Sequence, residues 1–190
     1  MTGSKHSNSL GNSCEVLVVM DLQPRLLSSI SGSSSLLNAN SILLRASEFL
    51  EIPTIITEQV PDKLGKTVPL ITESIASPQV IAKDSFSAFG SPEFCEKIQS
   101  LNAGRIILSG IETSICVFLT ALDAISSNIN VSVVSDCVGS RIMGDGDRCL
   151  KQLLYHGVEV IPLETYLFRN LKSSTHKSFK QITGLIKSRQ

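Results

Sequence analysis

Three side chains that can exchange protons or attack an electrophile follow predicted strands. Asp21, Lys83 and the segment leading to Cys116 each come directly after a short run of apolar, mostly β-branched residues. In an open parallel sheet, functional side chains gather at the carboxyl ends of strands, near the point where the strand order reverses. A carboxylate, an amine and a thiol could therefore meet at one edge of a sheet. That combination is suited to catalysis by a sulfur nucleophile.

Cys116 is the strongest of these candidates for a catalytic residue. It falls in the first turn of a helix predicted over 114–127, where unpaired backbone N–H groups and the helix dipole favour an anion. With a lysine nearby, this position predicts a thiol pKa well below the value of about 8.5 expected of free cysteine. Taken singly, an inward-facing cysteine is more often a small core residue, an aspartate at the position of Asp21 a turn residue, and a lysine at the position of Lys83 a solvated side chain.

The remaining histidines and cysteines offer little competing chemistry. The histidines are dispersed along the chain, so no Cys–His pair is predicted; they are His6, His156 and His176. The five cysteines form no C-x-x-C pair, which disfavours a disulfide framework or a zinc knuckle. Free thiols are typical of a reducing compartment, so a cytoplasmic location is expected. The cysteines are Cys14, Cys95, Cys116, Cys137 and Cys149.

Length, composition and charge limit the classes of function. The 190 residues are 42% hydrophobic and 18% charged, with a formal net charge of zero. This balance predicts one globular domain over residues 14–190 behind a flexible polar tail over 1–13. No basic run is present, so neither nucleic acid nor anionic lipid is an expected partner. No apolar run approaches the roughly 18 residues that a membrane span requires.

Predicted strands and helices alternate along the chain. The strands fall at 14–20, 54–57, 80–82, 105–109, 131–135 and 159–161, and helices are expected at 35–50, 91–101, 114–127 and 145–156. Strands that are apolar throughout indicate a sheet buried on both faces. With right-handed crossovers, the pattern predicts an α/β fold: a three-layer α/β/α sandwich around a doubly wound, mainly parallel six-stranded sheet.

Four motifs in order carry a resemblance to a known family. They are VVMDLQ, KDSFSAF, GIETSICV and VSVVSDCVGSR. Over Cys14 to Leu171 the chain resembles the isochorismatase-like cysteine hydrolase superfamily. The resemblance implies a catalytic triad of Asp21, Lys83 and Cys116. It also implies a cis peptide between Ile111 and Glu112, and an oxyanion hole formed by the backbone N–H groups of Glu112 and Cys116.

The same resemblance implies an activity. Acyl transfer through a thioester on the cysteine would cleave the C–N bond of a small amide or carbamoyl compound. Nicotinamidases of the superfamily use an Asp-x-His metal cluster, but the corresponding TEQVPDKLG has no histidine, so neither a metal nor another cofactor is expected. The cysteine also argues against the vinyl-ether cleavage of true isochorismatases. A homo-oligomer, dimer or larger, is expected, and Gln23, Phe86 and Phe89 are candidate residues of the substrate pocket.

Two other classes of function stay open on the sequence alone. The first is a catalytically idle member that binds partners through an oligomer surface. The second is a thiol redox sensor, because a reactive cysteine is also oxidisable. The sensor would need a second cysteine close to Cys116, and Cys137 is the candidate that the sequence leaves undecided.

Overall fold

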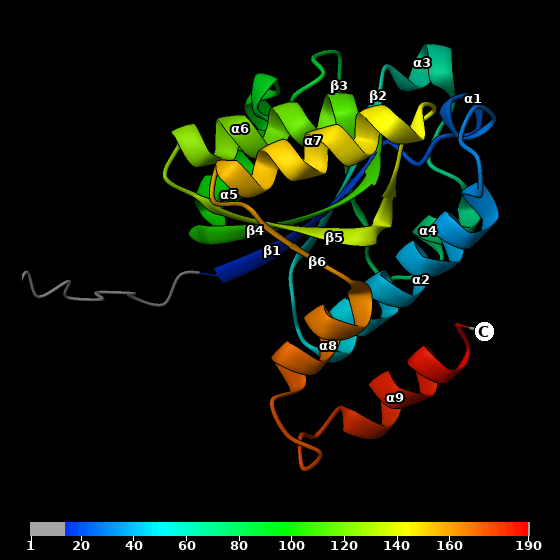
Figure 1. The fold of residues 1–190 in the computed structure, drawn as a ribbon, viewed down its shortest axis with the longest axis vertical. Coiled ribbons are helices and arrows are strands. Elements are labelled where there is room, and N and C mark those ends of the chain that lie inside the picture. The colour runs from blue at the N-terminus through cyan, green and yellow to red at the C-terminus, as the bar shows by residue number, and fades with distance from the viewer. Residues whose placement is uncertain (1–13, 190) are drawn as a thin grey trace, which may run out of the picture.

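Six parallel strands form one sheet in this computed structural model, which describes residues 14–189 (Figure 1). The sheet has the order β3-β2-β1-β4-β5-β6, so the direction of winding reverses at the central strand β1. The tail predicted over residues 1–13 lies outside the described residues. The strands are β1 (Cys14–Met20), β2 (Thr54–Gln59), β3 (Gln79–Lys83), β4 (Ala103–Ile111), β5 (Asn130–Gly139) and β6 (Glu159–Ile161).

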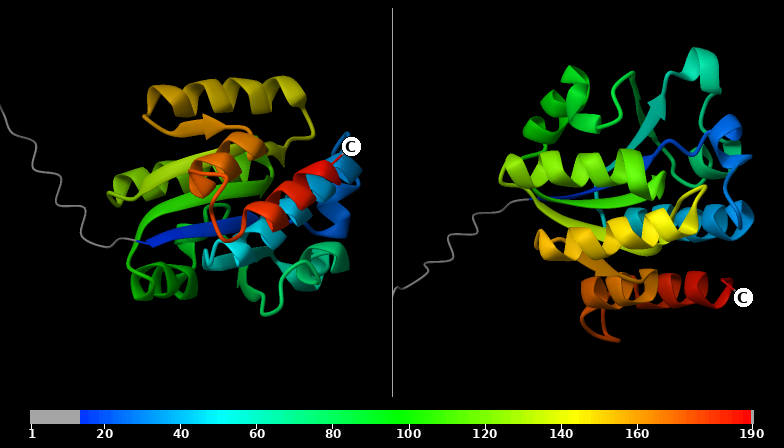
Figure 2. Two further views of the ribbon diagram at one scale, coloured as in Figure 1. Left: turned by 90° about the horizontal axis from the view of Figure 1, so that it is seen from below. Right: turned by 45° about the horizontal axis from the view of Figure 1, so that its top comes forward.

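Helices cover both faces of this sheet and complete the three layers (Figure 2). One face packs against α2 (Ser33–Phe49), α8 (Leu163–Leu171) and α9 (Phe179–Lys187); the other packs against α5 (Pro92–Ser100), α6 (Phe118–Ser126) and α7 (Met143–Tyr155). Three short helices that begin at proline lie in the connections after β1 and β2. They are α1 (Pro24–Leu27), α3 (Pro61–Leu64) and α4 (Pro69–Thr72).

The central strand β1 is apolar on both sides because each side packs against a helical layer. Leu17 and Val19 point into the cluster with α2, α8 and α9, whereas Val16, Val18 and Met20 point into the cluster with α5, α6 and α7. All five side chains are at most 1% exposed. This two-sided burial is the physical reason for the uninterrupted apolar run, and it confirms the predicted α/β/α sandwich.

The main departure from the predicted elements lies after β4. The helix predicted over 114–127 is divided: a π-helical turn spans Thr113–Val117, and α6 begins only at Phe118. Two other helices end on residues typical of helix termini. Ser91 caps α5 by accepting a hydrogen bond from the Phe94 N–H at 3.4 Å, and Gly157, with a left-handed φ of 80°, follows α7.

The described residues include no helix that is long and apolar enough to cross a membrane. All five cysteines lie in this part of the chain, and each is a free thiol.

Candidate active site

A buried ion pair joins the ends of β1 and β3. Asp21 follows β1 in a left-handed conformation with φ of 54°, and its backbone N–H donates to the Thr57 carbonyl at 3.0 Å. The Thr57 hydroxyl donates to Asp21 Oδ1 at 2.7 Å, and Lys83 Nζ donates to Oδ2 at 2.8 Å. Both charged side chains are fully buried. Each of the two groups thus has an oppositely charged partner and a further hydrogen bond, so neither is left unpaired in the interior.

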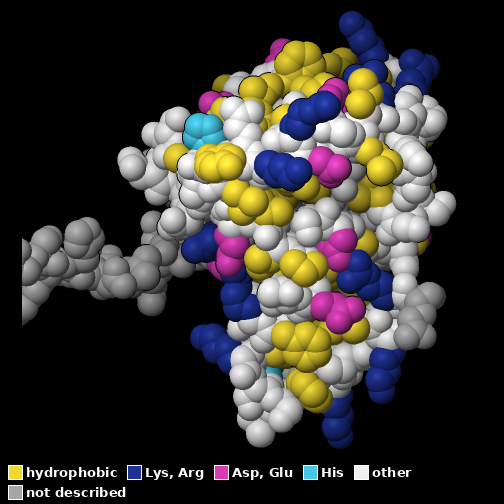
Figure 3. All heavy atoms as spheres, in the orientation of Figure 1, with side chains coloured by type: hydrophobic (Ala, Val, Ile, Leu, Met, Phe, Trp, Pro, Cys, Tyr) yellow, Lys and Arg dark blue, Asp and Glu magenta, His cyan; other side chains and the backbone are white. Residues whose placement is uncertain are grey.

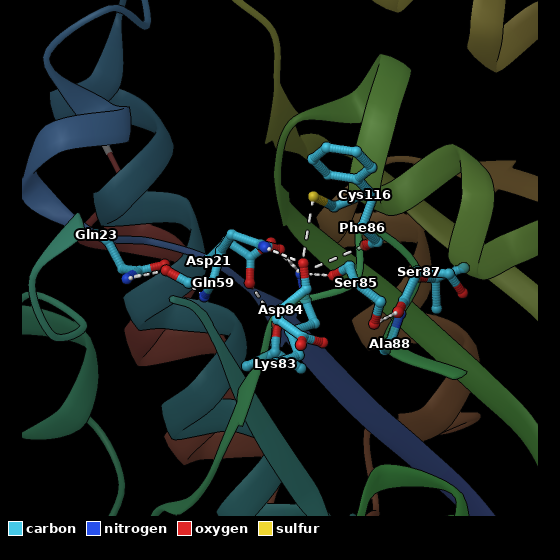
Figure 4. Close-up of polar contacts among 12 residues, drawn as sticks. Asp21, Gln23, Gln59, Lys83, Asp84, Ser85, Phe86, Ser87, Ala88 and Cys116 are labelled. Carbon is cyan, nitrogen blue, oxygen red and sulfur yellow. Dashed lines mark hydrogen bonds and ion pairs between the residues drawn. The ribbon is translucent and has the colours of Figure 1, made fainter. Parts of the chain in front are cut away.

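The Lys83 ammonium group is surrounded by further acceptors. Nζ donates to Gln59 Oε1 at 2.6 Å, and the backbone carbonyls of Ser85 and Phe86 lie at 3.2 and 3.3 Å. The sulfur of Cys116 lies 3.8 Å from the same nitrogen. Figure 4 shows these groups converging from β1, β2, β3 and the turn before α6. The cation therefore connects the carboxylate of Asp21 to the thiol of Cys116.

The loop after β3 is held in place by its own hydrogen bonds. Gln59 Nε2 donates to the Asp84 carbonyl at 2.8 Å, and the Ala88 N–H donates to the Thr120 hydroxyl of α6 at 2.9 Å. Within the loop, the Ser85 hydroxyl donates to the Ser87 carbonyl at 2.7 Å. These contacts fix the two carbonyls that face the Lys83 ammonium.

Close packing of β4 on β1 requires a glycine immediately before the nucleophile turn. Gly110 pairs with Met20 and has φ of 96°; a Cβ atom there would lie 2.1 Å from the Met20 carbonyl oxygen. One residue further on, the peptide bond between Ile111 and Glu112 is cis. The π-helical turn then brings Cys116, 7% exposed, over the ion pair.

The electrostatics of Cys116 contradict the lowered thiol pKa expected from its sequence position; that prediction was wrong. Burial is the largest effect, and together with the negative charge of Asp21 it raises the pKa of Cys116 to about 12. Lys83 and a hydrogen bond from the Glu112 backbone oppose this rise without cancelling it. The reason is structural: the lysine charge is already matched by Asp21, and Asp21 itself accepts a hydrogen bond from the thiol.

A cavity of about 340 Å³ lies above Cys116. Its walls combine apolar side chains with charged and polar ones: Leu26, Leu64, Phe86 and Ile115, and Arg25, Gln59, Glu112 and Arg141. Figure 4 shows the Phe86 ring beside the Cys116 sulfur. A second cavity of about 400 Å³ shares Glu112, Ile115 and Arg141 but is not lined by Cys116. The first cavity is therefore the candidate substrate site.

An ion pair forms part of the wall between these two cavities. Arg141 Nε donates to Glu112 Oε1 at 2.7 Å, and the Arg141 backbone N–H donates to Oε2 at 3.2 Å. Both oxygens of the Glu112 carboxylate are thus occupied, and the guanidinium group is held at the cavity wall.

Comparison with known proteins places the chain in a family. Residues 15–165 match the isochorismatase domain. The chain belongs to the isochorismatase family. It is 33% identical to isochorismatase domain-containing protein 2 of Xenopus laevis over 187 residues, which is 98% of this chain and 90% of the relative. The human protein of the same name is 30% identical and covers 90% of this chain and 82% of its own length.

Solved structures agree with this membership. A structure described as MAR1 ribonuclease from Caenorhabditis elegans is 32% identical, with a TM-score of 0.87 over 92% of this chain and 90% of that one. YcaC from Pseudomonas aeruginosa, solved with hexane-2,5-diol and covalent acrylamide, has a TM-score of 0.86 at 21% identity over 93% and 91% of the two chains. At that identity YcaC shows the fold alone. The family is an isochorismatase-like hydrolase family.

Most residues singled out from the sequence lie together in this isochorismatase-family site, but two pocket candidates do not line the cavity. Gln23 is fully buried behind it and bonds through its side chain to the backbone of Gln59 and Gly65. Phe89 packs edge-to-face on Phe94, with ring centroids 5.2 Å apart. Gln23 therefore supports the wall, and Phe89 is partly buried and packs against the core on the α5 and α6 side of the sheet. Phe86 does line the cavity and is 60% exposed.

Sequence reasoning missed Ser29 and three longer polar side chains of the cavity. Gln59 bonds to Lys83, while Arg25 and Arg141 stand in the wall. All three follow or end strands that the sequence correctly located, so the rule about carboxyl ends of strands could have selected them. Among the residues described, no cluster of three or more histidine, cysteine or acidic side chains could hold a metal ion.

Proposed function

We propose that this chain is a metal-independent cysteine hydrolase that cleaves a C–N bond of a small amide or carbamoyl compound through a thioester on Cys116. One observation carries the proposal: the Cys116 sulfur lies 3.8 Å from Lys83 Nζ, which is paired with Asp21 at 2.8 Å. These groups lie beneath a cavity of about 340 Å³, which can hold a small-molecule substrate. A nucleophile beside a cation that can stabilise its anion, with a carboxylate close by to accept its proton, is an arrangement suited to covalent catalysis.

The thiol pKa of about 12 indicates how attack begins. Cys116 rests as a neutral thiol that donates to Asp21. As the sulfur attacks the substrate carbonyl carbon, the thiol proton passes to the Asp21 carboxylate, and the carbonyl π electrons move onto oxygen. Lys83 stays protonated and stabilises the negative charge on sulfur. Proton transfer thus accompanies attack, with Asp21 as general base.

The tetrahedral intermediate then collapses. Its oxyanion would be bound by the backbone N–H groups of Glu112, which follows the cis peptide bond, and of Cys116 in the π-helical turn. The C–N bond breaks, protonated Asp21 donates to the departing amine, and a thioester remains. Water next adds to the thioester, gives its proton to Asp21, and displaces the sulfur, which recovers that proton. The net reaction converts an amide and water into a carboxylic acid and an amine.

The redox alternative finds no support in the position of Cys137. Cys137 is fully buried in the cluster with α2, α8 and α9, whereas Cys116 lies in the cluster on the other face of the sheet. The sheet thus separates the two sulfurs. RNA cleavage, which the name of the Caenorhabditis elegans structure suggests, is not proposed either, because a neutral chain and a cavity of about 340 Å³ suit a small substrate.

Ammonia release from a panel of small amides and ureido compounds tests the proposal, and intact-mass spectrometry can detect the acyl-enzyme. Cys116→Ser and Asp21→Asn should each lower turnover by about 10³-fold or more. Cys149→Ser is the matched control, because Cys149 is partly buried and does not line this cavity. Turnover that survives Cys116→Ser would overturn the mechanism. Cleavage of an RNA substrate that depends on Cys116, without amide turnover, would instead favour the ribonuclease.

A further inference from the structure

Two arginines stand on either side of the nucleophile turn. Cys116 follows β4, and the two neighbours of β4 in the sheet are β1 and β5. Arg25 lies in α1, directly after β1, and Arg141 follows β5; both line the cavity above Cys116. The sheet order thus brings one guanidinium group to each flank of the reacting sulfur.

Neither arginine has all of its donors occupied by the described part of the chain. Arg141 uses Nε for Glu112, which leaves its two Nη atoms without a hydrogen-bond partner among residues 14–189. Within the same residues, the Arg25 side chain has no hydrogen bond and no ion pair. A guanidinium group held by one edge presents its other donors in a planar fork, the geometry that matches a carboxylate.

The charges around the cavity favour an anion. Arg25 and Arg141 contribute two positive charges, and Glu112 contributes one negative charge. Asp21 and Lys83 cancel each other, and the Cys116 thiol is neutral. Leu64 also lines the cavity, and the residues around it carry a net positive charge. Lys63 and Lys66 are exposed there, with Asp62 as the nearby negative charge. Figure 3 shows lysine and arginine side chains at the corner formed by α1 and α3.

We propose that the substrate carries a carboxylate a few bonds from the scissile amide, and that Arg141 and Arg25 bind it. This inference rests on the proposed function and adds the substrate class. The apolar walls, Leu26, Leu64, Phe86 and Ile115, would contact the short hydrocarbon that joins the two polar ends. Glu112 is a positioning residue that orients Arg141 and leaves its Nη donors for the ligand.

A pair of isosteric substrates tests the charge directly. Succinamate and succinamide differ only in that a carboxylate replaces one carboxamide. The ratio of their kcat/KM values, corrected for the two amides of succinamide, should favour succinamate by about 10- to 100-fold, as expected for charge-assisted hydrogen bonds. Arg25→Gln and Arg141→Gln should each lower that ratio several-fold, mainly through KM for succinamate. Arg45→Gln is the matched control, because Arg45 is exposed on α2 outside the cavity lining.

A second readout does not depend on turnover. Iodoacetate and iodoacetamide are also isosteric, and both are thiol-alkylating reagents that can be tested on Cys116. The iodoacetate-to-iodoacetamide rate ratio at Cys116, divided by the ratio for glutathione at the same pH, should exceed one and should fall in Arg25→Gln and Arg141→Gln. A raised ratio without amide turnover would support the anion site while the proposed hydrolase failed. Amide turnover with no preference for succinamate, and an alkylation ratio equal to that of glutathione, would overturn the anion site alone.

Discussion

Replacing Asp21 by asparagine should make Cys116 more reactive toward alkylating agents while it abolishes turnover. Asp21 acts on the sulfur in two opposed ways. As a general base it is needed for catalysis, but its negative charge and the hydrogen bond that it accepts both raise the pKa of Cys116. A variant without this charge lacks the general base and, at the same time, has a lower pKa at the Cys116 thiol.

The magnitude follows from the pKa of about 12. At pH 7.5 such a thiol is ionised in about 1 molecule in 30,000, whereas a pKa of 9.0 would give about 1 in 30. Removing a neighbouring negative charge lowers a pKa by about 1–3 units. The alkylation rate at neutral pH should therefore rise by about 10- to 1,000-fold in Asp21→Asn.

The assay is the rate of iodoacetamide modification of Cys116, followed by peptide mass spectrometry between pH 6.5 and 10.5. In the wild type the logarithm of the rate should increase linearly with pH up to about pH 10, because the thiol remains protonated in that range. Lys83→Met should slow the reaction, since the cation lowers the pKa of Cys116. Thr57→Val is the matched control, because it removes one hydrogen bond to Asp21 and leaves the charge.

Each variant must first be shown to be folded by circular dichroism, because breaking a buried ion pair costs about 3–5 kcal/mol. Two results would refute the reasoning. One is a wild-type alkylation profile with a midpoint below pH 9. The other is a folded Asp21→Asn variant whose Cys116 reacts no faster than the wild type at pH 7.5.

Three further predictions concern the fold, the assembly and the ion requirement. Gly110→Ala should lower the free energy of unfolding by about 3 kcal/mol or more in urea titrations, because the new Cβ would meet the Met20 carbonyl at 2.1 Å; Gly157→Ala, with nothing within 4 Å, should cost less. Light scattering should give a mass of at least twice 20.5 kDa, since α7 and its N-cap expose Ile142 and Met143, which are 62% and 70% accessible; a mass of 20.5 kDa at micromolar concentration would contradict this. Amide turnover should be unchanged by EDTA, and activity that is lost to the chelator and restored by a divalent metal would contradict the proposed chemistry.

The sequence predicted the sheet well because strands that are buried on both faces are apolar throughout, which makes them easy to recognise. The limits of β1 and β6 match the predicted runs, whereas β4 and β5 are longer than predicted. The ends of β5 include Asn130, Asp136 and Gly139, which interrupt the apolar pattern although their backbones still pair. The short proline-started helices were missed, since four residues carry too little periodicity to be recognised.

The candidate site was predictable in its members but not in its electrostatics. Asp21, Lys83 and Cys116 could be selected because each follows a strand. The direction of the thiol pKa could not, because it depends on the depth of burial and on which neighbour takes the lysine charge. The contacts that the Lys83 ammonium group makes with the Gln59 side chain and with the carbonyls of Ser85 and Phe86 could not be predicted either, since they depend on where that group lies in the folded chain.

The reversal of winding at β1 also determines the order in which the residues of the site are synthesised. Asp21, Gln59 and Lys83 all belong to the first winding, β1 to β3, so the growing chain contains all three residues before β4 is synthesised. Cys116 belongs to the second winding and meets Asp21 and Lys83 only when β4 docks against β1. A nascent chain that ends after β3 therefore contains Asp21 and Lys83 but not Cys116.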